Sequence, residues 1–219
     1  MTPSVERSVP MTVVIAMKET DGSILIAADG EGTAEGGLKE HLPKLRRVTD
    51  RPLAWAASGN PDIGLREFGN WMTSYQWESA QWDSFISAAA DEVSRLNGIQ
   101  RERTKLSGVP VEEDKHLTEV VIAGWLDRPD IFVISNTGLK FSVWEPQEFI
   151  AIGSGGPFAK AMYNVLFHAQ GYERQHMMKL IMEVTISTAP NCGPPADCWR
   201  IGRSGITSVF SLNPILKHR

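Results

Sequence analysis

The stretch that decides the fold reads TVVIAMK at 12–18, TDG at 20–22 and ILIAADG at 24–30. Two apolar runs of strand length on either side of an Asp-Gly turn predict a β-hairpin. Neither run alternates apolar with polar residues, so both faces of the hairpin are expected to be covered by other layers of the fold.

The same stretch carries a hydroxyl, a carboxylate and an amine. Thr12 opens the first strand, Asp29 ends the second, and Lys44 follows in HLPKLRRV at 41–48. Threonine is a poor nucleophile unless a base stands beside it. A free α-amino group titrates near pH ~8 and is a suitable base if Thr12 is the first residue of the mature chain. Met11 directly precedes Thr12, so trimming an initiator methionine there would expose that amine.

Beyond the hairpin, the chain predicts strands, two helices, strands, two helices and strands, in that order. Asn60 and Pro61 are typical of a helix start, with Asn60 as the N-cap. Asn97 and Gly98 are typical of a helix end. Two separate helix pairs need apolar surface to cover, which two stacked sheets provide. The predicted strands are 13–17, 24–28, 45–49, 53–57, 119–125, 131–135, 141–144, 197–202 and 207–212, and the predicted helices begin near 61, 83, 157 and 173.

The length of 219 residues fits one domain with a sizeable core. Residues 1–11 are predicted to be a flexible leader or propeptide, because they are largely polar and contain Pro3 and Pro10. Residues 12–219 are predicted to form a single domain. Within it, the polar and charged segment 99–116 is expected to be a long loop insertion, a kind of segment that is often functional.

Composition argues against several classes of protein. Hydrophobic residues make up 42% and charged residues 22% of the chain, and the formal net charge is −4, so no basic surplus favours nucleic acid or an anionic membrane. No apolar run reaches the ~20 residues of a membrane span, and the N-terminus lacks the apolar core of a signal peptide. The two cysteines make neither a disulfide framework nor a zinc site, and the five histidines are scattered. We therefore expect a cytoplasmic protein without a metal or cofactor.

Three motifs, taken in order, resemble one known family. The first is the stretch from Thr12 to Lys44, the second is FIAIGSGGPFAKA at 149–161, and the third is CGPPADCWRI at 192–201. They resemble the proteasome β subunits and the related bacterial ATP-dependent ring protease, which are N-terminal-nucleophile (Ntn) hydrolases. The resemblance implies an α+β fold, a four-layer αββα sandwich in which two antiparallel sheets lie between two helical layers.

The resemblance also implies roles for individual residues. Thr12 would attack a peptide carbonyl, and its own α-amine would handle the proton. Lys44 would lower the effective pKa of the Thr12 hydroxyl, and Asp29 would keep Lys44 charged. Ser154, in GSGG, would hydrogen-bond near the Thr12 amine and support proton transfer.

Substrate-binding residues follow from a fourth short match. AASG at 56–59 resembles the strand end whose backbone N–H forms the family's oxyanion hole. We place this donor at Ala57 or Ser58, directly before Gly59, since backbone donors are preorganised for such work. Trp55 or a neighbour is expected to border the specificity pocket.

The chain departs from the family pattern at three positions. Met11 precedes the threonine, where self-cleaving precursors carry glycine. Ala189 stands where many active members have an aspartate, and Cys192 replaces a turn serine. The best interpretation is a threonine peptidase of this family. A catalytically weak or inactive structural subunit and a small-molecule amidase of the same fold remain as alternatives.

Partners are implied by the same resemblance. We expect a ring homo-oligomer of about six or more subunits, with Thr12 facing an interior chamber. Phe158, Met162 and Leu166, on the helix that begins near 157, are candidate contact residues. Peptides or unfolded proteins are the expected substrates. The resemblance also raises an ATPase unfoldase as a candidate partner, which the sequence does not identify.

Overall fold

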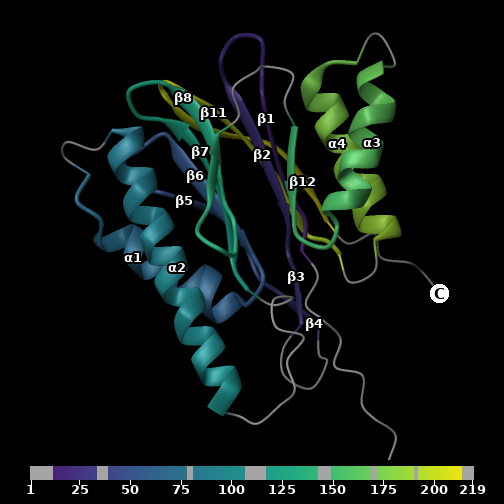
Figure 1. Cartoon of the computed structure of the whole chain (residues 1–219). Helices are drawn as coiled ribbons and strands as arrows, with labels where there is room; N and C mark the ends of the chain where they lie inside the picture. Colours follow the sequence, from purple (N-terminus) through teal and green to yellow (C-terminus); the bar gives the residue numbers. More distant parts are fainter. Residues whose placement is uncertain are drawn as a thin grey trace, which may run out of the picture.

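The computed structural model describes residues 12–33, 39–77, 81–106, 117–142, 149–168, 172–189 and 192–213. Within these residues, two five-stranded sheets lie face to face, and a helical layer covers the outer side of each (Figure 1). The predicted fold class, an α+β four-layer sandwich with two antiparallel sheets, is confirmed.

The first sheet contains the predicted hairpin. In spatial order its strands are β10 (Phe149–Ile152), β1 (Val14–Lys18), β2 (Ile24–Asp29), β11 (Ala196–Gly202) and β12 (Gly205–Leu212), and all neighbours are antiparallel. In the hairpin, Val14 pairs with Ala28. Thr12, which precedes β1, therefore lies at the same end of the sheet as Asp29, the last residue of β2.

The second sheet faces the first across the core. In spatial order its strands are β5 (Leu45–Arg47), β6 (Leu53–Ser58), β7 (Glu119–Trp125), β8 (Pro129–Ile134) and β9 (Lys140–Ser142), again all antiparallel. A separate hairpin pairs β3 (Glu31–Thr33) with β4 (Lys39–His41). Lys44 directly precedes β5, so this sheet brings a cation to the same region of the sandwich as Thr12.

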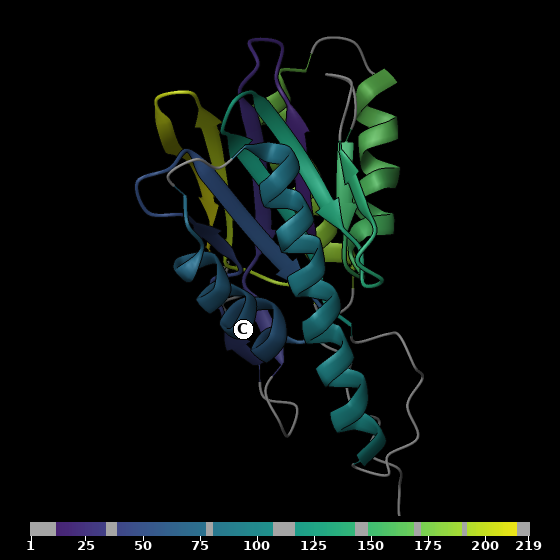
Figure 2. The same ribbon diagram turned by 60° about the vertical axis from the view of Figure 1, so that its left-hand side comes forward.

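Each sheet is covered by its own pair of helical segments. On the second sheet, η1 (Asp62–Glu67) continues into α1 (Phe68–Ser74), and α2 (Trp82–Leu106) packs beside them. On the first sheet lie α3 (Gly156–His168) and α4 (Arg174–Thr188). Figures 1 and 2 show the two pairs on opposite sides of the sandwich. η1 begins at Asp62, so its N-cap is Pro61 and not the predicted Asn60. The Asn60 side chain still accepts a hydrogen bond from the Asp62 N–H at 2.9 Å.

The continuous apolar run of β1 is explained by its central place. Val13, Ile15 and Met17 belong to the core between the first sheet and its helices. Val14 and Ala16 belong to the core between the two sheets. Because successive strand residues point to opposite faces, coverage on both sides leaves no place for a polar side chain at residues 13–17.

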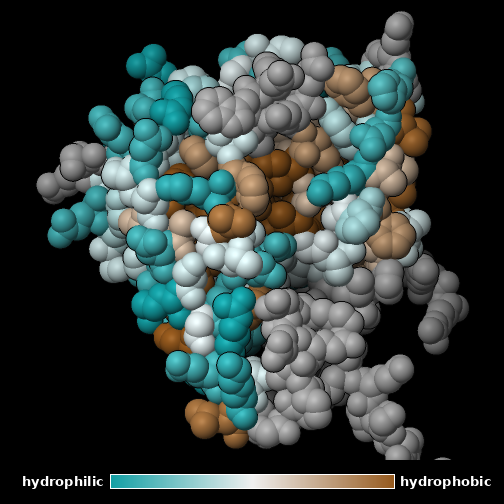
Figure 3. Space-filling view, in the orientation of Figure 1, coloured by the Kyte–Doolittle hydropathy of each residue, from teal (hydrophilic) through white to brown (hydrophobic). Residues whose placement is uncertain are grey.

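Apolar side chains also reach the surface. In the view of Figure 3 they gather in the centre of the molecule, between the two helical layers. On α3, Phe158, Val165 and Phe167 are exposed at 41%, 65% and 41%. None of the helices within the described residues is long and apolar enough to cross a membrane.

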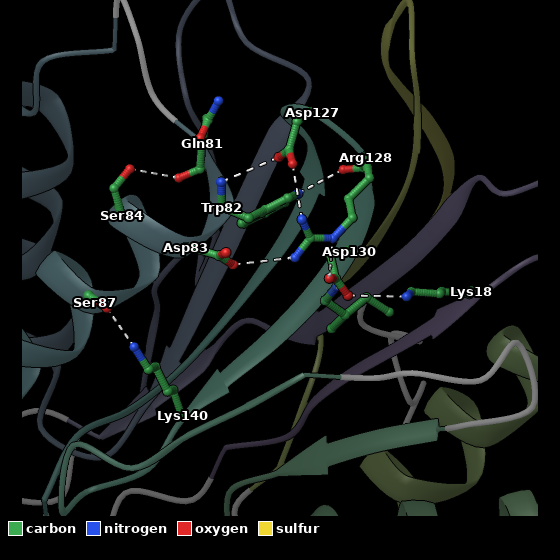
Figure 4. Close-up of polar contacts among 11 residues, drawn as sticks. Lys18, Gln81, Trp82, Asp83, Ser84, Ser87, Asp127, Arg128, Asp130 and Lys140 are labelled. Atoms are coloured by element: carbon green, nitrogen blue, oxygen red, sulfur yellow. Dashed lines mark hydrogen bonds and ion pairs between the residues drawn. The ribbon is translucent and has the colours of Figure 1, made fainter.

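A polar network ties the layers together at the end of β1 far from Thr12 (Figure 4). Lys18 Nζ of β1 donates to Asp130 Oδ1 of β8 at 3.1 Å, which joins the two sheets. Arg128 Nε lies 3.4 Å from Asp130 Oδ2, and its Nη2 reaches Asp83 of α2 at 3.5 Å. The carboxylate of Asp130 therefore contacts two cations, one from β1 of the first sheet and one from the turn between β7 and β8.

The predicted end of the second helix is wrong. α2 continues through Asn97 and Gly98 to Leu106, so residues 99–106 of the expected loop insertion are helical. The Asn97 side chain is fully buried and bonds to Thr118 and Asn136, residues distant in sequence, instead of capping its own helix. The remainder of that segment, 107–116, and the predicted leader 1–11 lie outside the described residues.

Candidate active site

Three side chains from different elements meet at one end of the sandwich. Lys44 Nζ donates to Thr12 Oγ1 at 2.9 Å and to Asp29 Oδ1 at 2.9 Å. Thr12, Asp29 and Lys44 are buried, with exposed fractions of 4%, 0% and 5%. One ammonium group thus links the hydroxyl at the start of β1 with the carboxylate at the end of β2.

Asp29 is held by backbone groups as well. Its Oδ1 accepts from the Val13 N–H at 2.9 Å, and its Oδ2 accepts from the Gly193 N–H at 3.4 Å. Burial raises the pKa of Asp29, whereas the Lys44 charge and the two N–H donors act in the opposite direction. These donors fix the carboxylate in the orientation that contacts Lys44.

The backbone of Thr12 is held by the turn between β10 and α3. Ser154 Oγ accepts from the Thr12 N–H at 3.2 Å, and the Gly155 N–H donates to the Thr12 carbonyl at 3.1 Å. Gly153 packs so closely on that carbonyl that an added Cβ would collide with its oxygen, and the φ of Gly153 is +80°. The GSGG motif is therefore explained locally: glycine is needed at 153, and Ser154 then lies at the Thr12 nitrogen.

The predicted substrate-binding residues divide between the two faces of β6. Ser58 ends the strand, and its Cβ lies 3.3 Å from a Cβ built on Gly153, the same glycine that packs on Thr12. Gly59 follows with a φ of +96°. Ala57 points the other way, toward Gly64 of η1, so only its backbone remains a candidate donor.

Trp55 does not lie beside Thr12. Its ring is 3% exposed and packs edge-on against Phe68 of α1, with ring centroids 5.3 Å apart. Trp55 therefore belongs to the core between the second sheet and its helices. Strand alternation places residue 55 on the helix side and residues 54 and 56 between the sheets. Its expected place at a specificity pocket is not supported.

Two of the three departures from the family pattern, Ala189 and Cys192, lie close together behind the site, and the third, Met11, lies outside the described residues. Ala189 follows α4 and is buried, and the Cys192 N–H donates to its carbonyl at 3.4 Å. The Cys192 sulfur packs 2.9 Å from a Cβ built on Gly155. Ala189 contributes no carboxylate here, while Gly193, the residue after Cys192, contributes its N–H to Asp29. The sequence offered no signal for that bond beyond the CGPP turn itself.

The chemistry available at this site is that of an activated hydroxyl. A buried ammonium 2.9 Å from a threonine oxygen favours the alkoxide form of that oxygen. Within the described residues, no three His, Cys, Asp or Glu side chains lie close enough together to hold a metal ion.

No protein-family model matches the sequence. The ATP-dependent protease subunit HslV of Syntrophobacter fumaroxidans (strain DSM 10017 / MPOB) is 25% identical over 178 residues, which cover 80% of this chain and 88% of that protein. Among solved structures, a Gly-1 mutant of Anbu from Hyphomicrobium sp. strain MC1 matches with a TM-score of 0.70 at 16% identity, covering 94% of this chain and 89% of that one. Anbu, an ancestral beta-subunit, from Yersinia bercovieri matches with a TM-score of 0.69 at 13% identity, covering 93% and 88%.

The two kinds of likeness agree. The sequence likeness extends over most of both chains, and the structural likeness covers nearly the whole fold. The chain therefore resembles the proteasome-like Ntn hydrolases in sequence and has their fold.

Proposed function

We propose that this protein is a threonine hydrolase that cleaves peptide bonds with Thr12 once Thr12 is the first residue of the mature chain. The observation that carries the proposal is the position of Lys44 Nζ, 2.9 Å from both Thr12 Oγ1 and Asp29 Oδ1. Ser154 Oγ adds a hydrogen-bonding group 3.2 Å from the Thr12 nitrogen. A nucleophile, its electrostatic activator and a group beside the base are thus in contact before any substrate arrives.

The proposed reaction runs in two steps. Thr12 Oγ attacks the substrate carbonyl carbon while its proton passes to the α-amine, whose ordinary pKa is near ~8. The Lys44 ammonium stabilises the developing charge on Oγ, and Asp29 keeps Lys44 in place. Collapse of the tetrahedral intermediate breaks the C–N bond, and the leaving amine takes the proton. Water then hydrolyses the threonine ester by the same base.

The oxyanion donor is proposed at the end of β6. The backbone N–H of Ala57 or Ser58 is the candidate, because Ser58 lies next to Gly153 and hence near the Thr12 backbone. A preorganised backbone donor of this kind typically contributes ~10²–10³-fold to the rate.

The test is the first residue of the purified protein together with its peptidase activity. Mass spectrometry should find Thr12 at the N-terminus, and Thr12→Ala should abolish hydrolysis of a fluorogenic peptide amide while leaving the circular dichroism spectrum unchanged. Serine at this position should keep measurable activity, because it also supplies a hydroxyl. Full activity in a folded Thr12→Ala protein would refute the proposal.

A structural subunit with little activity is the second candidate. Ala189 favours it, because the resemblance implies a supporting aspartate at that position. An intact leader in the purified protein, together with no peptide turnover, would support this alternative. Turnover of small amides but not of peptides would instead indicate an amidase of the same fold.

Assembly is part of the proposal. HslV is named a protease subunit and Anbu an ancestral beta-subunit, and α3 exposes large apolar side chains. We propose a ring homo-oligomer of about six or more copies in the cytoplasm, acting on peptides or unfolded proteins. An ATPase unfoldase is proposed as a partner because HslV is named a subunit of an ATP-dependent protease.

A further inference from the structure

We propose that Glu119 is a positioning residue of this site: its carboxylate holds the Gly153 N–H and so fixes the Gly153–Ser154 turn against Thr12. The inference rests on the proposed function and deepens it. It also names a carboxylate for a site in which Ala189 provides none.

The position of Glu119 is set by sheet pairing. It is the first residue of β7 and pairs with Ser58, the last residue of β6. Gly153 lies between Ser58 and Thr12, because a Cβ built on it would meet the side chain of the one and the carbonyl of the other. Directly paired strand residues project to the same face of a sheet, so the Glu119 side chain lies beside Ser58 and hence beside Gly153. The Gly153 N–H acts on the Glu119 carboxyl as a donor and lowers its pKa. Glu119 therefore connects the strand end that carries the proposed oxyanion donor with the turn that carries Ser154.

The backbone before Glu119 is unusually well anchored. Asn97 Nδ2 donates to the Thr118 carbonyl at 2.9 Å, and Asn97 Oδ1 accepts from the Thr118 N–H at 2.9 Å. The same Nδ2 donates to the Asn136 carbonyl at 3.0 Å. One fully buried carboxamide from α2 thus satisfies both polar backbone groups of Thr118. Glu119 is presented from a fixed strand end, which is what a positioning residue requires.

The surroundings of Glu119 suit a hydrogen-bond acceptor that does not contact the reacting atoms. The residue is half-buried. Burial raises the pKa of its carboxyl, while Lys160 of α3 and the Gly153 N–H partly offset this effect. Glu119 acts on Thr12 indirectly, through the backbone of Gly153 and Ser154. A shift of about 1 Å in a positioning element can cost ~10²-fold in rate, so a bond to this turn is able to control the rate.

The experiment compares two substitutions of matched size in the purified protein. Glu119→Gln keeps an acceptor oxygen for the Gly153 N–H, whereas Glu119→Met removes it. We expect Glu119→Met to lower kcat for a peptide amide by about tenfold or more with KM changed less than about twofold, and Glu119→Gln to recover most of kcat. Glu183→Ala is the control and should behave like the wild type, because it removes an exposed glutamate of α4 that lies 3.9 Å from Lys179.

Deuterium exchange supplies a readout that does not need turnover. The amides of residues 153–155 should exchange faster in Glu119→Met than in the wild type and in Glu119→Gln. Unchanged kcat and exchange in Glu119→Met, or a Glu119→Gln protein as slow as Glu119→Met, would overturn the inference. A rise in KM alone would overturn it too, because it would make Glu119 a substrate contact.

The two proposals fail in different ways. If Thr12→Ala abolishes activity and Glu119→Met leaves it unchanged, only the role proposed for Glu119 is refuted. If the wild-type protein begins at Thr12 and has no hydrolytic activity, both proposals are refuted.

Discussion

At the scale of single residues, Lys44 is the group on which the site depends most. It is the one side chain among the described residues whose ammonium touches both Thr12 Oγ1 and Asp29 Oδ1. Its loss removes the activator of the hydroxyl and leaves Asp29, which is fully buried, without its cation. Substitution of Lys44 should therefore lower both the stability of the fold and the catalytic rate, and the two effects can be measured separately.

Lys44→Met should lower kcat by about 10²-fold or more, since the lost interaction develops with charge in the transition state. It should also lower the free energy of unfolding by about 3 kcal/mol or more, because a buried charge loses its partner. Adding Asp29→Asn to Lys44→Met should recover part of that stability and none of the rate. Steady-state kinetics and denaturant unfolding check both expectations. A Lys44→Met enzyme with wild-type kcat would show that another group activates Thr12.

Glu119 predicts a pH effect on stability whose sign follows from burial. Its folded-state pKa is raised above the ordinary value of 4.5. Above that pH the unfolded chain releases the proton more readily than the folded one, so this group's contribution to stability is present at lower pH and is lost as pH rises through the folded pKa. Glu119→Gln removes this titration. The difference in Tm between Glu119→Gln and the wild type should become more positive as pH rises from 4.5 toward neutrality. A constant difference would contradict the effect.

The sequence predicted the site residues that belong to short motifs, and it did not predict contacts between residues far apart in the chain. Thr12, Asp29, Lys44 and Ser154 are brought together as a group, although their catalytic roles stay predictions. The bond from Gly193 to Asp29 spans 164 residues and leaves no local pattern. Nearness to AASG in the chain suggests a place for Trp55 at the pocket, but neighbouring strand residues point to opposite faces, and Trp55 points to the helices.

At the scale of the elements, most segments could be predicted from periodicity. Continuous apolar runs gave the central strands, and the apolar positions Phe85, Ala89 and Val93 gave the buried face of α2. The end of α2 could not be predicted, because Asn97-Gly98 reads locally as a cap. The Asn97 side chain instead donates hydrogen bonds to the carbonyls of Thr118 and Asn136. At Gly98 an added Cβ would meet nothing within 4 Å, so no close contact requires a glycine there. The long-range hydrogen bonds of Asn97 therefore outweighed the local preference of Asn-Gly for ending a helix.

The ion pair between the sheets gives a prediction at this scale. Asp130→Asn should lower the free energy of unfolding by about 1–3 kcal/mol, because Lys18 and Arg128 lose a charged acceptor that is 8% exposed. The kcat of the folded fraction should not change, since Lys18 and Thr12 lie at opposite ends of the first strand. Asp83→Asn is the control, because its side chain is 92% exposed and exposed pairs contribute about 0–1 kcal/mol. Equal losses for the two variants would argue against a stabilising role for the ion pairs of Asp130.

At the scale of the whole molecule, one side of α3 bears on assembly. Val165 and Phe158 are 65% and 41% exposed and share this side by helical spacing, whereas Phe167, also 41% exposed, lies on the opposite side of the helix. Apolar side chains grouped on one helix are typical of a surface that another protein covers.

Val165→Glu tests whether that surface joins copies of this chain. In the proposed homo-oligomer it should lower the mass measured by light scattering coupled to size exclusion, because a buried carboxylate without a partner is costly. The Tm of the dissociated chain should stay close to that of the wild-type chain at high dilution, since Val165 contributes little to its own core. Lys179→Glu, on the exposed side of α4, controls for added negative charge. A wild-type protein that already elutes as a 24.2 kDa monomer at micromolar concentration would refute the ring and favour the small-molecule amidase.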